Sequence, residues 1–379
     1  MSTAPRIVVA DDSALMRRVV ASNLRGAGFQ IAGEAADGDE ALALCRELRP
    51  DAMTLDLTMP GRDGLGVLRE LGEHGPSVPT VVVSAFSPRH GARAVDALGL
   101  GAFELVAKPG GPSGIAAFGE ELCAKVRAAV ATSGRAPRSA PERPAAPAPA
   151  PAGGAGGAPS RAAAALRAAA VGAPVSSAER LVVIASSTGG PRALGELVPA
   201  LPAPLGAAVV IVQHMPAGFT ASLAARLDAA SSLTVREAAD GARLEPDTAL
   251  LAAGGLHLRV DERRARVTDE SEIGGLRPRA DLTIADAARA FGARLLLVVL
   301  TGMGRDGTAG AEEVRRHGGR VLVEAESTCT VYGMPRAVAD AGLADAVLPL
   351  DELPGAIVRE LATGAGRRPV AGAFAGARR

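Results

Sequence analysis

Short apolar runs alternate with helical patterns along the first 130 residues. The runs are Ile7–Ala10, Gln30–Glu34, Ala52–Leu55, Val81–Val83 and Leu105–Ala107. They are rich in Val and Ile and bounded by turn residues, so the pattern predicts buried parallel strands. Apolar positions at helical spacing lie between them. We therefore expect a βα repeat that builds an α/β sheet with helices on both faces.

The same alternation returns between residues 180 and 355. The apolar runs are Leu181–Ala185, Ala207–Val212, Ala249–Ala253, Leu295–Leu300 and Val321–Val323. Helical patterns at Arg192–Leu201 and Phe219–Leu227 follow two of them. This half of the chain predicts a second doubly wound α/β domain with a mostly parallel sheet.

Between the two halves, residues 131–178 consist mainly of Ala, Pro, Gly, Ser and Arg. Such a segment cannot bury enough apolar surface to offset its ordering entropy, so we expect a flexible linker. A helical spacer at "RAAAALRAAA" is the alternative. The predicted division is a first domain at 1–130, the linker, a second domain at 179–365 and a disordered tail at 366–379.

Composition narrows the class of protein. The 41 basic and 41 acidic residues balance, and 2% of residues are aromatic. With no basic stripe and few aromatic stacking platforms, nucleic-acid binding and a transcriptional output are disfavoured. Three separated cysteines without a CxxC pair indicate neither a zinc site nor a disulfide framework. We expect a monomeric cytoplasmic protein that does not insert into a membrane.

Polar residues follow the predicted strands of the first domain. They are Asp11, Asp12, Asp56, Ser84 and Lys108. In open α/β sheets the carboxyl ends of the strands hold the ligand, so three carboxylates would converge there and require a cation such as Mg²⁺. Asp56 would then be a nucleophile toward a phosphoryl donor. Taken singly, these residues could be helix caps or turns.

A second set of polar residues follows three strands of the second domain. A serine of "SSTGGPRAL" follows the first strand, His214 the next, and Asp306 lies in "TGMGRDGT". If these strands are adjacent and parallel, a Ser-His-Asp triad forms at one sheet edge. The glycine-rich turn could instead bind phosphate, although it lacks the lysine of a Walker motif. His257 is the rival candidate for the base.

The first half of the chain resembles response-regulator receiver domains in "VVADDSALMRRVV", "MTLDLTMPGRDGLGVL", "VVVSAF" and "FELVAKP". The resemblance implies a flavodoxin-like, five-stranded parallel sheet and phosphorylation of Asp56 by a histidine kinase. It also implies a Mg²⁺ site, formed by Asp11, Asp12, Asp56 and the Thr58 carbonyl. The conformational switch that responds to phosphorylation would consist of Ser84, Phe103 and Lys108. In that family the bond at Lys108–Pro109 is often cis.

The second half is similar to the catalytic domain of chemotaxis (CheB-type) protein-glutamate methylesterases. The motifs are "SSTGGP", "VIVQHMP", "LAAGGLHL", "LTGMGRDG" and "VYGMPRA". The resemblance implies that Ser187 rather than Ser186 is the nucleophile, with His214 as the base and Asp306 as the orienting carboxylate. Thr188 and the Met303 backbone N–H would stabilise the oxyanion.

The resemblance also implies a function. The substrate would be glutamate γ-methyl esters of chemoreceptors, with receptor glutamines as a second substrate, and ester hydrolysis would need no cofactor. Three departures from the family pattern, Ser186, Ala253 and Arg279, leave the substrate preference open. A scaffold domain recruited by a phosphorylated receiver is the non-enzymatic alternative.

Overall fold

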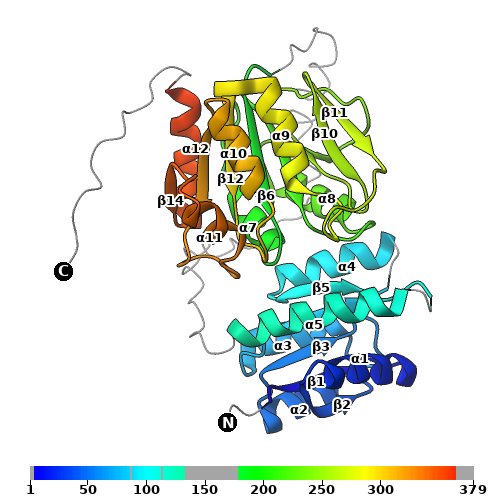
Figure 1. Cartoon of the computed structure of the whole chain (residues 1–379). Helices are drawn as coiled ribbons and strands as arrows, with labels where there is room; N and C mark the ends of the chain where they lie inside the picture. The colour runs from blue at the N-terminus through cyan, green and yellow to red at the C-terminus, as the bar shows by residue number, and fades with distance from the viewer. Residues whose placement is uncertain (1–3, 86–87, 112–113, 133–177, 364–379) are drawn as a thin grey trace, which may run out of the picture.

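The computed structural model describes residues 4–85, 88–111, 114–132 and 178–363, which form two α/β domains (Figure 1). The predicted linker (131–178) and tail (366–379) lie outside the described residues except at the two ends of the linker, where a helix continues to Thr132 and Ala178 is buried.

The N-terminal domain is built on one five-stranded sheet with the strand order β2-β1-β3-β4-β5, all parallel. The strands are β1 (Arg6–Ala10), β2 (Gln30–Ala35), β3 (Ala52–Leu55), β4 (Thr80–Ser84) and β5 (Glu104–Ala107). This order and the parallel pairing confirm the flavodoxin-like prediction. Each apolar run of the sequence lies within a strand or differs from it by one residue at an end.

Five helices cover this sheet. They are α1 (Ala14–Gly26), α2 (Gly38–Leu48), α3 (Gly64–His74), α4 (Pro88–Gly99) and α5 (Ile115–Thr132). The helices α1 and α5 bury their apolar residues against one face, and α2, α3 and α4 against the other. Ser13 caps α1, because its hydroxyl oxygen accepts the Met16 N–H at 3.4 Å.

The C-terminal domain contains a seven-stranded parallel sheet in the order β14-β13-β12-β6-β7-β9-β8. Its strands are β6 (Leu181–Ser186), β7 (Ala208–Gln213), β8 (Thr234–Glu237), β9 (Thr248–Leu251), β12 (Leu295–Val299), β13 (Arg320–Glu324) and β14 (Ala346–Leu348). The strands β12, β6 and β7 are neighbours at the centre of the sheet. This adjacency is the condition that a triad at the strand ends requires.

Helices cover both faces of this sheet as well. On one face lie α7 (Gly190–Leu197), α8 (Thr220–Ala230) and α12 (Leu353–Ala362), and on the other α9 (Ala280–Phe291), α10 (Thr308–Arg316) and α11 (Met334–Asp340). The antiparallel hairpin of β10 (His257–Asp261) and β11 (Arg264–Thr268) is separate. The prediction of a helix up to Leu201 was wrong, because Pro199 cannot donate the next backbone hydrogen bond.

The two domains meet through α4. This helix packs against α7 and α8, and one buried apolar cluster contains residues of both domains (Figure 1). Arg226 on α8 pairs with Asp96 on α4 at 3.1 Å. A Cβ at Gly91 would lie 2.5 Å from the Gly218 carbonyl, so the backbones approach closely there.

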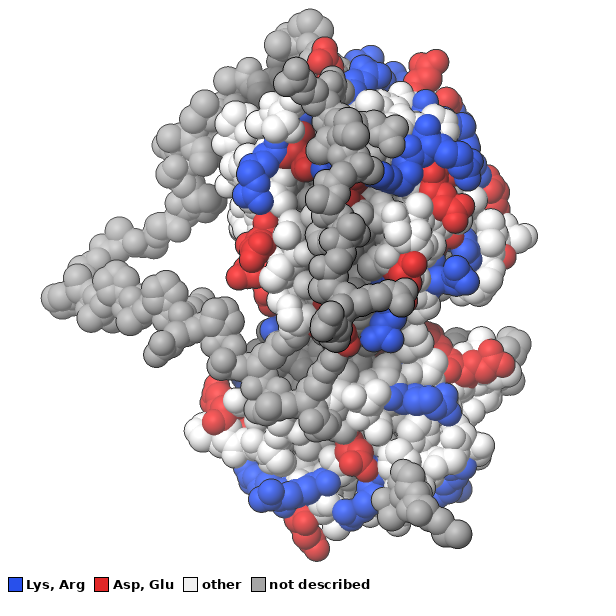
Figure 2. Space-filling view, turned by 60° about the vertical axis from the view of Figure 1, so that its left-hand side comes forward, with Lys and Arg blue, Asp and Glu red and all other residues white. Residues whose placement is uncertain are grey.

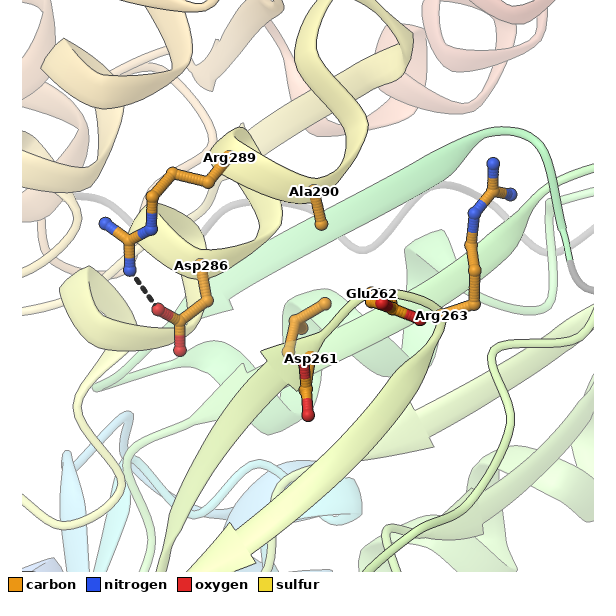
Figure 3. A pocket seen from close by; sticks show the side chains of 7 residues that line it. Asp261, Glu262, Arg263, Asp286, Arg289 and Ala290 are labelled. Atoms are coloured by element: carbon orange, nitrogen blue, oxygen red, sulfur yellow. Dashed lines mark hydrogen bonds and ion pairs between the residues drawn. The ribbon is translucent and has the colours of Figure 1, made fainter.

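The surface carries both signs of charge. In the view of Figure 2, basic and acidic side chains are interspersed over both domains. Among the described residues, no helix is long and apolar enough to cross a membrane. A hollow of about 460 Å³ lies between α9 and the β10–β11 hairpin (Figure 3). Its lining includes an Arg289–Asp286 ion pair and none of Ser187, His214 or Asp306.

Candidate active site and phosphoacceptor site

The predicted acidic residues of the N-terminal domain lie together at the carboxyl ends of β1 and β3. Asp11, Asp12 and Asp56 each offer a carboxylate oxygen, and these atoms lie within 4.8 Å of one another. Lys108 follows β5 and places its Nζ 2.8 Å from Asp11 Oδ2 and 2.9 Å from Asp56 Oδ2. One ammonium therefore faces a site with three carboxylates.

The electrostatics of this site favour a further cation. Burial raises the pKa of Asp11, and the Lys108 contact offsets this effect only in part. Burial also opposes the charge of Lys108, but hydrogen bonds to Asp11 and Asp56 outweigh it and raise the pKa of Lys108. Carboxylate oxygens are the ligands that Mg²⁺ takes in proteins, so the donor set fits this ion.

Ser84 ends β4 beside this site. It is 1% exposed, and its hydroxyl has no hydrogen-bond partner among the described residues. A buried hydroxyl without a partner costs free energy, and a phosphoryl oxygen on Asp56 would satisfy it.

Two other residues and one peptide bond were named from the receiver resemblance. Thr58 is exposed, two residues after Asp56, and Phe103 is half-buried against the apolar cluster under α1 and α5. The cis expectation at Lys108–Pro109 was wrong: the cis bonds of the described segments are Ala203–Pro204 and Arg277–Pro278. Trans is the lower-energy isomer of such a bond.

In the C-terminal domain, β6 delivers Ser187 to a tight turn before α7. Gly189 has φ +79°, and a Cβ there would lie 2.4 Å from the Thr330 side chain. A Cβ at Gly302 would lie 2.8 Å from Ser187 Cβ, so the 302–307 loop passes directly against the serine. Glycine at both positions lets two backbones close around this side chain.

His214 and Asp306 form the central contact of the site. His214 Nε2 lies 2.8 Å from Asp306 Oδ2, and both side chains are nearly buried. His214 follows β7, and its N–H donates to the Ser186 carbonyl at 3.0 Å, which places it beside the serine turn. Among the described residues, no hydrogen bond joins Ser187 Oγ to His214. With Nε2 on Asp306, Nδ1 is the nitrogen left for the serine.

Asp306 is held by four hydrogen bonds. Its Oδ2 also accepts the Ala280 N–H at 2.7 Å, and Oδ1 accepts the N–H groups of Asp281 and Gly307 at 2.9 and 3.0 Å. Burial opposes ionisation, but the hydrogen bonds from His214 and the Asp281 backbone outweigh it. They hold the pKa of Asp306 well below its usual range. The carboxylate is therefore fixed in position and charged.

The rival histidine has a different environment. His257 is 1% exposed at the start of β10. Its Nδ1 accepts the Arg279 N–H at 3.2 Å, and its Nε2 lies 3.2 Å from the Ser271 carbonyl. Both ring nitrogens are satisfied by backbone groups, so His257 supports the chain around Arg279 and is not available as the base.

The two candidate serines are also distinguished. Ser186 is fully buried, and its hydroxyl donates to Gln213 Oε1 at 2.6 Å. Gln213 Nε2 in turn donates to the carbonyls of Ser187 and His214 at 3.0 and 2.9 Å. Sequence reasoning missed this bridge between the nucleophile and base segments. Its signal was the polar Ser186 and Gln213 at the ends of two buried strands.

The proposed oxyanion groups flank Ser187. Thr188 is 2% exposed, and Met303 lies in the loop that contacts Ser187. Neither backbone N–H donates a hydrogen bond to an acceptor among the described residues, as the predicted oxyanion role requires. Ala253, a departure from the family pattern, follows β9 and is half-buried.

Each half of the chain matches a known protein family. Residues 182–357 match the family model described as CheB methylesterase, and residues 7–118 match the response regulator receiver domain. The two matched segments contain the two sites described above.

Full-length relatives are similar across both halves. The chain is 42% identical to protein-glutamate methylesterase/protein-glutamine glutaminase 5 of Myxococcus xanthus, over 91% of this chain and 95% of that protein. It is also 42% identical to the protein-glutamate methylesterase/protein-glutamine glutaminase of Symbiobacterium thermophilum, over 95% and 98%. A solved structure, the Thermotoga maritima CheB methylesterase catalytic domain, is 43% identical, with a TM-score of 0.47, over 48% of this chain and 97% of that one.

Proposed function

Since the chain belongs to the CheB methylesterase family and carries a receiver domain, we propose that it is a phosphorylation-activated protein-glutamate methylesterase of a chemotaxis system. The substrates are glutamate γ-methyl esters on chemoreceptors. The observation that carries this function is the 2.8 Å contact of His214 with Asp306 beside Ser187, at the ends of three adjacent parallel strands.

The hydrolysis follows from the positions of these side chains. His214 accepts the Ser187 proton through Nδ1, and Ser187 Oγ attacks the ester carbonyl carbon. Asp306 stabilises the imidazolium that forms. The backbone N–H groups of Thr188 and Met303 receive the oxyanion. His214 then protonates the methoxide, methanol leaves, and water attacks the acyl-enzyme by the same route.

Deamidation of receptor glutamines uses the same groups. The leaving group is then ammonia, which His214 must protonate as the tetrahedral intermediate collapses. The relatives' names join both activities, and the same active-site groups support both here.

The receiver domain supplies the control. A histidine kinase of the cytoplasm is the phosphodonor, and the Asp56 carboxylate is the acceptor. Asp11, Asp12, Asp56 and the Thr58 carbonyl would hold Mg²⁺, which would supply positive charge to balance that of the phosphoryl group. Lys108 and the Ser84 hydroxyl bind the phosphoryl oxygens on Asp56.

The contact between the domains is the coupling element. Helix α4 follows β4 and Ser84, and it packs on α7 and α8, which follow the nucleophile and base segments. A phosphoryl group that draws Ser84 and Phe103 toward Asp56 changes the position of α4 and weakens its contact with the catalytic domain. Release of this contact opens the Ser187 site to the receptor.

The test is methanol release from methylated receptor membranes. We expect Ser187→Ala to abolish release, a loss of at least about 10⁴-fold. Ser186→Ala is the matched control: it leaves the buried Gln213 Oε1 without its donor, which costs about 1–3 kcal/mol of stability, and it should retain activity within about tenfold. Undiminished release by folded Ser187→Ala protein would refute the assignment.

A further inference from the structure

Arg279 contacts the carboxylates behind the catalytic histidine. It precedes α9, and its Nη2 donates to Asp281 Oδ2 at 2.9 Å while its Nε lies 3.5 Å from Asp306 Oδ1. Nη1 donates to the Ile273 carbonyl at 3.0 Å. The side chain is 22% exposed, and two hydrogen bonds and one ion-pair contact hold the guanidinium in this partly desolvated position.

Asp281 is the second carboxylate of this cluster. Its Oδ1 accepts the N–H groups of Gly307 and Gly310, both at 2.8 Å, which connects it to the loop of Asp306 and to α10. Burial, together with the negative charge of Asp306, raises the pKa of Asp281. Asp281 therefore needs a cation to remain charged at low cost.

The charge of this cluster acts on His214. Two carboxylates on one side of an imidazole favour its protonated form, which cannot accept the Ser187 proton. Arg279 cancels one of the two negative charges. The net charge behind His214 is then that of a single carboxylate.

We propose that Arg279 is a positioning residue that neutralises Asp281 beside Asp306, so that His214 works as a base at lower pH than with a neutral residue at position 279. This inference rests on the proposed function, because it concerns the base of that reaction.

Two other ionisable groups adjoin this cluster, His257 through a hydrogen bond and Arg305 through the chain. His257 accepts the Arg279 backbone N–H on Nδ1 at 3.2 Å. Arg305 precedes Asp306 and is exposed, and no hydrogen bond or ion pair joins its side chain to a described residue. Solvent screens its charge, which makes Arg305 a matched control for Arg279.

The experiment is a pH titration of the His214 ring by NMR in the full-length protein with labelled histidine. The signal is assigned with His214→Gln among five histidines. We expect Arg279→Met to move the His214 midpoint up by about one pH unit. Arg279→Lys keeps the charge and moves it less. The double variant Arg279→Met/Asp281→Asn removes both charges and returns the midpoint toward that of the wild type, whereas Arg305→Met leaves it in place.

The rate of Ser187 labelling by a fluorophosphonate is measured on the same proteins. At pH values below the His214 midpoint of both proteins, Arg279→Met should be labelled about tenfold more slowly than the wild type. At pH values above both midpoints the two labelling rates should converge. An unmoved His214 midpoint, or an equal loss of rate at every pH, overturns the inference and makes Arg279 a structural residue. If the wild type is not labelled but the His214 midpoint still shifts in Arg279→Met, the proposed hydrolase activity is refuted. The inferred effect of Arg279 on His214 is then still supported.

Discussion

Asp56 and Asp306 are buried to the same degree, 4% and 3% exposed, and each follows a parallel strand of its own domain. Their surroundings differ. The Asp56 side chain contacts Lys108 among the described residues, whereas Asp306 receives four hydrogen bonds from three backbone N–H groups and one imidazole. A carboxylate whose lone pairs are all taken can orient and stabilise a partner, and one with free lone pairs can attack or bind a cation. The number of donors separates the two roles.

The source of the donors also differs. Three of the four donors to Asp306 are backbone N–H groups at the start of α9 and in its own loop. The donor to Asp56 is the end of a flexible lysine side chain. This arrangement is compatible with the proposed exchange of Lys108 for a metal ion and a phosphoryl group at Asp56, whereas Asp306 cannot move without losing its hydrogen bonds from the backbone before α9 and α10.

The largest effect is expected for Asp306, whose carboxylate accepts four hydrogen bonds. Asp306→Asn should lower kcat/KM for ester hydrolysis by about 10⁴-fold, because an amide presents an N–H to His214 Nε2 or to the backbone donors. Thermal unfolding of the same variant controls for the fold. Retention of activity within about tenfold would show that Asp306 does not orient the base.

Asp56→Asn should abolish the stimulation of hydrolysis by a phosphodonor but leave basal hydrolysis intact. We expect the ratio of stimulated to basal methanol release with a phosphodonor to fall to about one, since no group remains to shift the docking equilibrium. Removal of Mg²⁺ by a chelator should have the same effect on the wild type. Asp37→Asn is the control, because Asp37 caps α2 and asparagine caps equally well. Stimulation that survives in Asp56→Asn would place the phosphoacceptor elsewhere.

The smallest effect is expected at the contact between the two domains. Arg226→Ala removes the ion pair with Asp96, whose side chains are 47% and 58% exposed. Exposed pairs contribute about 0.2–1 kcal/mol, so basal hydrolysis should rise by no more than about fivefold. Arg192→Ala is matched to it, because its pair with Glu196 is similarly exposed but lies within α7. A larger rise in Arg192→Ala than in Arg226→Ala would contradict the coupling through α4.

The sheets and the chemistry at their edges were predictable from local sequence. A buried parallel strand is a short apolar run, and the polar residue after it lies at the edge that binds ligands. This is why Asp56, His214 and Asp306 could be named before any contact was known. The strands β8 and β14 were missed because both lie at sheet edges and are partly exposed: β8 has a single apolar residue, and β14 is apolar but only three residues long.

The sequence by itself determined the order of elements, the two sites and the residues that could do chemistry, because these follow from patterns a few residues long. Tertiary structure decided which nitrogen of His214 faces Asp306, that His257 is a structural residue, and that Arg279 lies against Asp281 and Asp306. The His214–Asp306 and Arg279–Asp306 contacts join residues 92 and 27 positions apart. Such contacts depend on how α9, β7 and the 302–307 loop pack, and no local pattern encodes that packing.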